Sequence, residues 1–411
     1  MAHVPYVAGS GVEGGVSMGR VAGARVGRIM LPALLATALI EAVSGCGRDD
    51  AGTSARLSLT ETLGGADTVG YARAIEPRPF TFPRDHGPHP DFRNEWWYVT
   101  GNLADDTGRN VGFQLTLFRS SLAPVAPGTK SAWATNQAWM GHFAVTDEEG
   151  GRFQSFQRFA RGAVGLAGAE SDPFNVWVED WSLQGEGPGV TWPLRLHAAD
   201  GDVALDLVLE PGKPAVLQGD AGLSRKGPEL GNASYYYSFT RMPTRGQVVL
   251  EADTLQVIGA AWLDREWSTS ALPEGVEGWD WFALQLDNGW DLMVYALRRA
   301  DGSAHPLSYG VLVDPSGGRY PLAYGSDIAV APTDTWTSPL DGSLYPSGWT
   351  VTLPGRGWRL EVLPVLEDQE LDLAFRYWEG AVAVSGTDGD IALGGRGYVE
   401  LTGYAGSRPE R

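Results

Sequence analysis

From residue 77 onward the chain alternates short apolar runs with turns rich in Gly, Asp and Pro, and no long stretch repeats its apolar residues at the helical period. Residues 111–117 (VGFQLTL) and 203–209 (VALDLVL) alternate with a period of two, as half-buried strands do. Residues 287–289 (DNG) lie between two such runs and predict a hairpin turn. These patterns predict an all-β protein built from barrels or sandwiches.

Four sequence features occur twice along the chain in the same order, which indicates an internal repeat. The matched segments are 95–119 with 279–298, 203–211 with 359–364, 235–237 with 377–379, and 259–264 with 395–400. Chance similarity among strand patterns is the alternative explanation. The repeat predicts two similar domains, at residues 76–272 and 273–411.

The N-terminus has the organisation of an export signal. Three arginines precede the apolar residues 31–43 (LPALLATALIEAV), which are too few to span a membrane as a helix. Two small residues then lead to Cys46, as lipoprotein processing requires. We therefore expect residues 1–45 to be a signal peptide, Cys46 to carry a lipid and residues 46–75 to be a flexible tether. An ordinary cleaved signal with an incidental cysteine is the alternative.

The composition limits the partners that the chain can have. The formal net charge of −19 repels nucleic acid and anionic lipid head groups. A lipid on Cys46, and no basic patch, would hold the protein at a membrane. We expect it in the cell envelope, at the outer membrane or the periplasmic face of a Gram-negative host. Because Cys46 is the only cysteine, the fold depends on its core and not on disulfides.

Aromatic residues are unusually frequent, with 16 Trp, 14 Tyr and 13 Phe. Such a load fits a β-rich core with aromatic cross-strand pairs, and it also fits an aromatic-lined cavity for an apolar ligand. Composition alone does not separate these two interpretations.

Residues 262–267 (WLDREW) place two acids and one arginine between two tryptophans. On a strand Trp262, Asp264 and Glu266 share one face, while Arg265 points to the other. If the first face looks into a barrel, desolvation and mutual repulsion favour keeping one carboxyl protonated. A neutral carboxylic acid in an apolar site is a competent proton donor. Pairing of these acids with an arginine at the surface is the alternative.

Further aromatic residues are expected near this acid. Tyr235 and Tyr237 share a face of the preceding strand, and Asp280 and Trp281 open the second domain close by. Aromatic faces stabilise a cation through the ring quadrupole. An acid such as Asp264 could protonate an alkene, the rings could stabilise the carbocation, and water or an internal group could quench it. Each tyrosine could equally be an ordinary core residue.

Other catalytic signatures are weak. The chain has no Gly-x-Ser-x-Gly elbow, no His-Glu-x-x-His motif and no phosphate-binding loop. His86 and His89 in residues 85–91 (DHGPHPD) could bind a metal, but a tight loop of this kind usually satisfies backbone groups. We expect neither a metal nor a cofactor.

Several long motifs resemble those of the AttH/CrtC family, which includes carotenoid 1,2-hydratases and exported proteins labelled predicted hydrolases. The motifs lie at residues 82–90, 94–101, 233–238, 262–267, 278–281 and 377–380. The resemblance spans residues 76–406 and implies two consecutive lipocalin-like β-barrel domains.

The resemblance also bears on the chemistry. Hydratases of the family add water to an isoprenoid double bond, and similar fungal proteins act as Diels–Alder cyclases. Trp262 and Asp264 match the aromatic residue and the proposed proton donor of the hydratases. Tyr235 and Tyr237 stand where the hydratases carry a His and an aromatic residue, so the His that would activate water is missing.

Together these features predict a lipid-anchored enzyme, a hydratase-like lyase or a cyclase or isomerase, that acts on a hydrophobic unsaturated isoprenoid or lipid. We expect the catalytic residues to be Asp264, Glu266, Tyr235, Tyr237 and Trp262, and the substrate-binding residues to be Trp96, Trp97, Trp279, Asp280 and Trp281. A non-catalytic lipocalin-like lipid carrier and a secreted hydrolase are the alternatives.

Overall fold

The structure is a computed structural model that describes residues 68–189, 191–269, 272–273 and 275–406. The predicted signal peptide, residues 1–45, and the predicted lipid-bearing Cys46 lie outside the described residues. So does the predicted tether, residues 46–75, up to residue 67. The described residues all belong to one compact unit of the chain.

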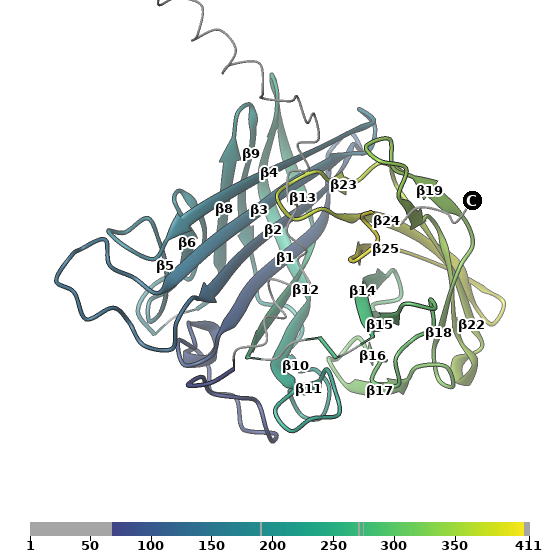
Figure 1. The fold of residues 1–411 in the computed structure, drawn as a ribbon. Coiled ribbons are helices and arrows are strands. Elements are labelled where there is room, and N and C mark those ends of the chain that lie inside the picture. The colour runs from purple at the N-terminus through teal and green to yellow at the C-terminus, as the bar shows by residue number, and fades with distance from the viewer. Residues whose placement is uncertain (1–67, 190, 270–271, 274, 407–411) are drawn as a thin grey trace, which may run out of the picture. The chain divides into compact units, whose positions relative to one another are not determined.

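The first part of the described chain forms one large antiparallel sheet that curves into a nearly closed barrel (Figure 1). Its strands are β1 (Asn94–Asp105), β2 (Asn110–Ser121), β3 (Gln137–Asp147), β4 (Arg152–Arg161), β5 (Ala167–Ser171), β6 (Phe174–Val178), β7 (Trp181–Gln184), β8 (Leu194–Asp200), β9 (Val203–Leu209), β10 (Val216–Leu217), β11 (Leu223–Arg225), β12 (Ala233–Leu250) and β13 (Asp253–Ser268). A short 3-10 helix, η1 (Arg84–His86), precedes β1.

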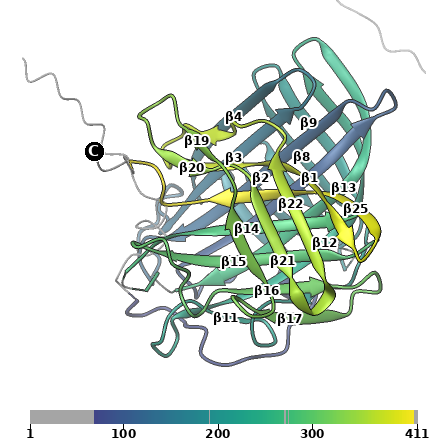
Figure 2. The ribbon, with the colours of Figure 1, turned by 90° about the vertical axis from the view of Figure 1, so that its right-hand side faces the viewer.

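The second part forms another antiparallel sheet, which curves into a half-barrel and faces the viewer in Figure 2. Its strands are β14 (Val276–Leu286), β15 (Asp291–Arg299), β16 (Tyr309–Val313), β17 (Arg319–Ala323), β18 (Ala329–Pro332), β21 (Trp349–Leu353), β22 (Trp358–Pro364), β23 (Glu370–Leu371), β24 (Tyr377–Asp388) and β25 (Ile391–Leu401). The strands β19 (Thr335–Thr337) and β20 (Leu344–Pro346) form a separate pair, and η2 (Pro354–Arg356) follows β21.

The two sheets repeat one strand order. The first contains the path β4-β3-β2-β1-β13-β12-β9-β8, and the second contains β17-β16-β15-β14-β25-β24-β22-β21. All four sequence features of the predicted repeat fall on corresponding strands of these paths. The all-β prediction and the pair of lipocalin-like barrels are thereby confirmed, although the second barrel is open. The predicted domain limits, 76–272 and 273–411, stay predictions.

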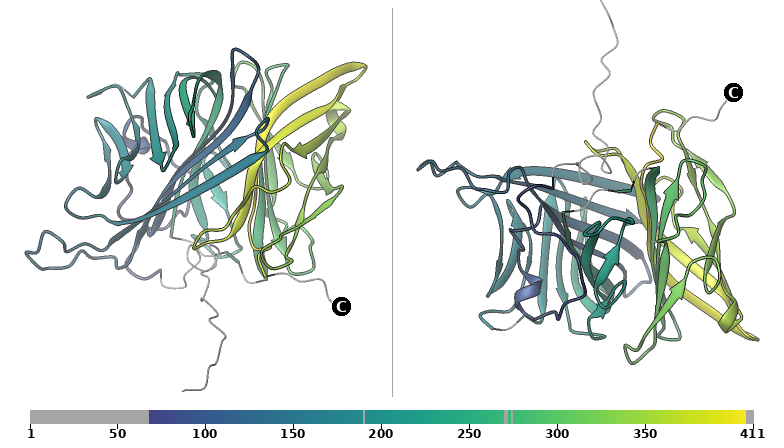
Figure 3. Two further views of the ribbon diagram at one scale, coloured as in Figure 1. Left: turned by 90° about the horizontal axis from the view of Figure 1, so that it is seen from above. Right: turned by 60° about the horizontal axis from the view of Figure 1, so that its bottom comes forward.

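The strands β1, β2 and β12 of the first sheet contact β25, β24 and β14 of the second. Both views of Figure 3 show the purple-to-teal and the green-to-yellow sheets as neighbours. Gly112 on β2 shows how closely they approach, because a Cβ atom there would lie only 2.6 Å from the Cβ atom of Ala381 on β24. A larger residue at position 112 would push the sheets apart.

Buried apolar side chains form three large clusters and a small fourth one around Phe118, Met140 and Phe375. One cluster, which includes Trp97, Leu263 and Trp267, lies inside the first barrel, and a second, which includes Phe282 and Trp349, lies inside the half-barrel. A third cluster, which includes Trp262 and Trp281, joins the two sheets. The strands at the junction are therefore covered on both faces. Among the described residues, no helix has the length and apolar character needed to cross a membrane.

Candidate active site

The end of β13 distributes its side chains between the barrel interior and the junction of the sheets. Alternation sends Leu263 and Trp267 into the first barrel, whereas Trp262 packs in the cluster that joins the sheets. Asp264 and Glu266 share the face of Trp262, and both are buried. The two acids therefore face the second sheet.

Asp264 is surrounded by neutral hydrogen-bond donors. The hydroxyl groups of Tyr236 and Ser238, on the neighbouring strand β12, donate to its two carboxyl oxygens. Trp262 Nε1 donates to Asp264 Oδ1 at 2.7 Å. Burial raises the pKa of Asp264 to about 7, although the three hydrogen bonds oppose that rise. A carboxyl group with a pKa near neutrality can give up and take back a proton under physiological conditions.

Glu266 differs from Asp264 because a cation lies beside it. Lys226 Nζ is 2.9 Å from Glu266 Oε1, and Ser234 Oγ donates to the same oxygen. The ammonium group also lies 4.0 Å from the centre of the Tyr295 ring of β15. Glu266 is thus part of an ion pair at the junction, next to an aromatic ring of the second sheet.

The second sheet contributes two more carboxyl groups, Glu379 of β24 and Glu400 of β25. The two residues are directly opposite each other in the strand register. Tyr98 Oη donates to Glu379 Oε1 at 2.6 Å, and Trp279 Nε1 donates to Glu400 Oε2 at 3.1 Å. Glu379 is buried, while Glu400 keeps some accessible surface.

The protonation of this pair follows from its surroundings. Burial and then the charge of Glu400 raise the pKa of Glu379 well above its usual range. Burial raises the pKa of Glu400 to about 7, and the charges of Asp264 and Glu266 add to the rise. Because two like charges cannot both be kept in a buried site without a counter-ion, the pair retains at least one proton at neutral pH.

Aromatic rings from both sheets connect the two groups of acids. Trp281 Nε1 on β14 donates to Tyr236 Oη at 3.2 Å, which links the second sheet to the hydroxyl group that binds Asp264. The ring of Trp281 is edge-on to those of Tyr98 and Trp262, with centroids 5.1 and 6.1 Å apart. Ring faces in this arrangement can stabilise positive charge that develops beside the carboxyl groups.

A neutral histidine lies at the border of the same region. His142 of β3 is buried, and its Nδ1 atom is 2.8 Å from the hydroxyl oxygen of Tyr377 on β24. Burial lowers the pKa of His142 to about 3, so the ring is uncharged at neutral pH. Its Nε2 atom is 2.7 Å from Gln157 Nε2.

Comparison with known proteins places the chain in a family. The profile of AttH-like proteins matches residues 73–404. The chain belongs to the AttH-like family. No curated protein matches the chain.

Solved structures share the fold of this AttH-like protein. A Nitrosomonas europaea protein assigned to AttH has a TM-score of 0.71 at 36% identity, with 81% of this chain and 100% of that chain covered. Kievitone hydratase from Nectria haematococca has a TM-score of 0.61 at 15% identity, with coverage of 82% and 97%. CghA with Sch210972 has a TM-score of 0.52 at 12% identity, with coverage of 84% and 98%. The last two likenesses concern the fold alone.

The structure of the present chain brings six of the predicted site residues to the junction of the sheets. Asp264, Glu266, Trp262, Trp96, Trp279 and Trp281 are at this junction. It also adds residues that the sequence prediction missed, namely Tyr98, Tyr236, Ser238, Lys226, Glu379 and Glu400. The strict alternation of β1 would have placed Tyr98 with Trp96. The faint repeat would have placed Glu400 in the position that Asp264 has in the first sheet.

Three predicted aromatic residues lie elsewhere. Tyr235, Tyr237 and Trp97 point into the first barrel and belong to its core. The placement of the two tyrosines beside Asp264 is therefore wrong, whereas the predicted contact of Trp97 with a substrate stays a prediction. Tyr235 Oη donates to the carbonyl oxygen of Glu76, and Tyr237 Oη is 2.7 Å from His86 Nδ1. These hydroxyl groups hold the segment before β1 against the barrel.

A β-bulge in β12 explains the misplaced tyrosines. Between Met242 and Phe239 this strand contains one residue more than β13 opposite it. One extra residue moves every side chain beyond it to the other face of the sheet. Continued without the bulge, the register of the hairpin would place Tyr237 opposite Glu266, but Tyr236 has that position.

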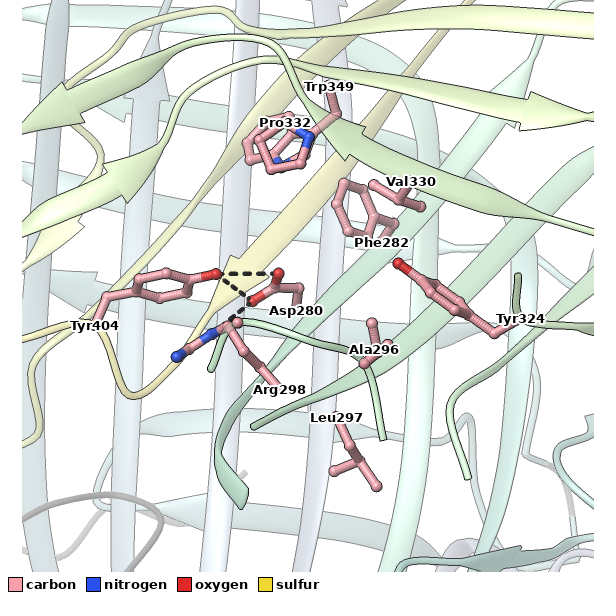
Figure 4. Close-up of a pocket in the computed structure, with 12 residues that line it drawn as sticks. Asp280, Phe282, Ala296, Leu297, Arg298, Tyr324, Val330, Pro332, Trp349 and Tyr404 are labelled. Carbon is pink, nitrogen blue, oxygen red and sulfur yellow. Dashed lines mark hydrogen bonds and ion pairs between the residues drawn. The ribbon is translucent and has the colours of Figure 1, made fainter. Parts of the chain in front are cut away.

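Asp280 lies on the other face of β14 from Trp279 and Trp281. It alternates with Trp279 and Trp281 and therefore points into the half-barrel, where it meets Tyr404 and Arg298 (Figure 4). Adjacent side chains of a regular strand point to opposite faces, so Asp280 does not face the junction with the two tryptophans. Its predicted contact with a substrate stays a prediction.

His86 and His89, in the loop before β1, each bind a different hydrogen-bond partner. His89 Nε2 is 3.0 Å from Asp85 Oδ1, and its ring stacks on Trp267 at 3.7 Å. His86 binds Tyr237 as described above. Within the described part of the chain, no group of three His, Cys, Asp or Glu residues could hold a metal ion.

The raised pKa of Asp264 predicts that its contribution to stability decreases as the pH rises. Asp264 holds its proton more tightly in the folded than in the unfolded chain, so the folded state binds more protons between about pH 4 and 7. The contribution of this group to the free energy of unfolding should fall as the pH rises through this window, by roughly 1 kcal/mol per pH unit. Urea unfolding at half-unit pH intervals measures the slope. Asp264→Asn should flatten it, and equal slopes in both proteins would contradict this assignment.

Proposed function

We propose that the junction of the sheets is the active site of an enzyme that protonates a carbon–carbon double bond in a hydrophobic isoprenoid or lipid. The observation that carries the proposal is the position of Asp264, a buried carboxyl group with neutral donors, beside aromatic rings of both sheets. An acid of this kind is neutral often enough to be a proton donor. The fold shared with kievitone hydratase, whose name describes the addition of water, supports the proposal.

In the proposed reaction Asp264 gives its proton to one alkene carbon, and positive charge develops on the other. The rings of Trp262, Trp281 and Tyr98 stabilise that charge. In a hydration, the oxygen of a water molecule bonds to the cationic carbon and releases a proton. An ionised carboxylate of the Glu379–Glu400 pair can accept this proton, in place of the histidine that the hydratases carry where this chain has Tyr235 and Tyr237. In an isomerisation or a cyclisation the cation would instead lose a proton or be attacked by a second double bond.

Lipid extraction followed by mass spectrometry tests the substrate class. Protein purified from its native envelope should carry an unsaturated isoprenoid or lipid, and incubation of that compound in deuterated water should add deuterium to carbon. A bound compound without any double bond would contradict the proposal.

The two alternative functions have less support. A carrier needs no acid between its sheets, whereas four carboxyl groups converge there. A hydrolase would need a nucleophile with a base or a metal at the His86 and His89 loop. Both histidines instead hold neighbouring side chains.

We further propose that Cys46 is lipid-modified and holds the enzyme at the cell envelope. The signal-like residues before it support this proposal. Mass spectrometry of the full-length protein should detect a diacylated cysteine at the new N-terminus, and Cys46→Ser should release the protein from the membrane fraction. An unmodified Cys46 in the mature protein would contradict the anchor.

A further inference from the structure

A cavity of about 110 Å³ lies inside the half-barrel, on the opposite face of β14 from the acids of the junction (Figure 4). It is bounded by side chains of β14, β15, β18 and β21, together with Tyr404 from the segment after β25. Its volume is of the same order as the roughly 150 Å³ that accommodates benzene in an engineered protein cavity. The space is therefore suited to a molecule of about one ring.

One end of this cavity is polar. Tyr404 Oη lies 3.0 and 3.1 Å from the two carboxyl oxygens of Asp280. Arg298 stacks on the Tyr404 ring, with the guanidinium carbon 3.7 Å from the ring centre, and its Nη2 atom donates to the carbonyl oxygen of Thr402. The acid and the guanidinium group are thus held in place by other residues, and their charges cancel.

Two residues that line the same cavity carry a buried N–H group that has no hydrogen-bond partner among the described residues. Arg298 Nε is buried without a hydrogen bond and lies 3.8 Å from Asp280 Oδ1, too far to donate to it. Nε1 of the fully buried Trp349 also has no hydrogen-bond partner. An unsatisfied buried donor is costly, so a ligand oxygen that reached either group would be stabilised by it.

The remaining walls combine apolar and aromatic side chains with Tyr324, which brings a phenolic hydroxyl group. Phe282 and Trp349 are edge-on to each other with ring centroids 5.4 Å apart, and Val330 and Ala296 complete the wall. An oxygen that accepts from Arg298 or Trp349 and donates to Asp280 must carry a hydrogen. The complementary ligand is therefore neutral, with one hydroxyl group on a compact apolar body.

We propose that the half-barrel is a second ligand site, separate from the junction, which binds a small neutral phenol or alcohol of about single-ring size. The hydroxyl group donates to Asp280 and accepts from Arg298 or Trp349, and the ring packs against Phe282 and Trp349. No reaction is implied, because the groups at this end neutralise each other.

Phenol and toluene form a matched pair of probes that differ by a hydroxyl and a methyl group. Titration calorimetry and saturation-transfer NMR should show that phenol binds, and that toluene binds roughly tenfold more weakly because it leaves the polar end unsatisfied. Trp349→Phe, which keeps a ring but removes the N–H group, should weaken phenol severalfold and leave toluene unchanged.

A filling variant tests the location. Ala296 is directly opposite Asp280 in the strand register, so Ala296→Leu should fill the cavity and abolish binding of both probes. Asp264→Asn, on the other face of the fold, should bind phenol as the parent does. Equal affinity for phenol and toluene, unchanged binding by Ala296→Leu, or ordered water alone in a crystal soaked with phenol would each overturn the proposal.

Discussion

Replacing Asp264 by asparagine is expected to lower turnover of the native substrate by roughly a hundredfold to ten-thousandfold, the usual contribution of a general acid. The amide keeps the shape of the carboxyl group but has no proton that it can transfer. The same change should raise the free energy of unfolding at pH 8. At that pH the carboxylate is ionised in a site whose burial raises its pKa to about 7, and the amide removes that charge. Loss of activity together with a gain in stability is typical of a residue kept for function.

A buried carboxyl group outside the junction provides the control. Asp147, at the end of β3, forms ion pairs with Arg109 and Arg152 at 2.8 and 2.9 Å. Burial alone would raise its pKa, but the two guanidinium groups lower it to about 2. Asp147→Asn should therefore reduce stability at neutral pH and leave turnover unchanged. Steady-state kinetics on the identified substrate, with urea unfolding of both variants, separates the two roles. Full activity of Asp264→Asn would refute the proposed mechanism.

The sequence predicted the strands and the shared face of the WLDREW motif because both depend on local alternation. Trp262, Asp264 and Glu266 do share a face, and Arg265 does point the other way. Alternation could not decide which face is the barrel interior, because the residues from Ala261 to Ser268 are buried on both sides. The first sheet alone leaves that face uncovered, and only the second sheet completes the site.

The sequence could not show which tyrosine of β12 faces Asp264, and the reason is a different one. The bulge residues Thr240 and Arg241 bind Asp291 of β15 in the second sheet, at 2.7 and 2.6 Å. The position of the bulge is thus stabilised by a contact between residues about fifty positions apart. A local pattern contains no trace of such a contact, so the choice between Tyr236 and Tyr237 lay beyond sequence reasoning.

Replacing Glu95 by glutamine is expected to produce the largest loss of stability in the first barrel, about 3–5 kcal/mol. Glu95 is fully buried at the start of β1 and forms ion pairs with Arg119 and Arg265. Burial alone would raise the pKa of Glu95, but the two guanidinium groups hold it well below its usual range. The amide would leave both cations without a counter-charge in a region that water does not reach.

The double variant Glu95→Gln/Arg265→Met separates the loss of this ion pair from damage to packing. Arg265 lies 3.9 Å over the Trp97 ring and donates to the carbonyl oxygen of Gly87, so methionine keeps part of its apolar contact but removes the stranded charge. The double variant should therefore be more stable than Glu95→Gln alone.

The pH dependence gives a second test. The lowered pKa of Glu95 contributes stability above about pH 4, and this stability is lost as the pH falls. The deficit of Glu95→Gln relative to the parent should accordingly be largest at neutral pH and shrink in acid. A deficit that is the same at pH 3 and pH 7, or a double variant less stable than the single one, would assign the cost to packing instead of charge.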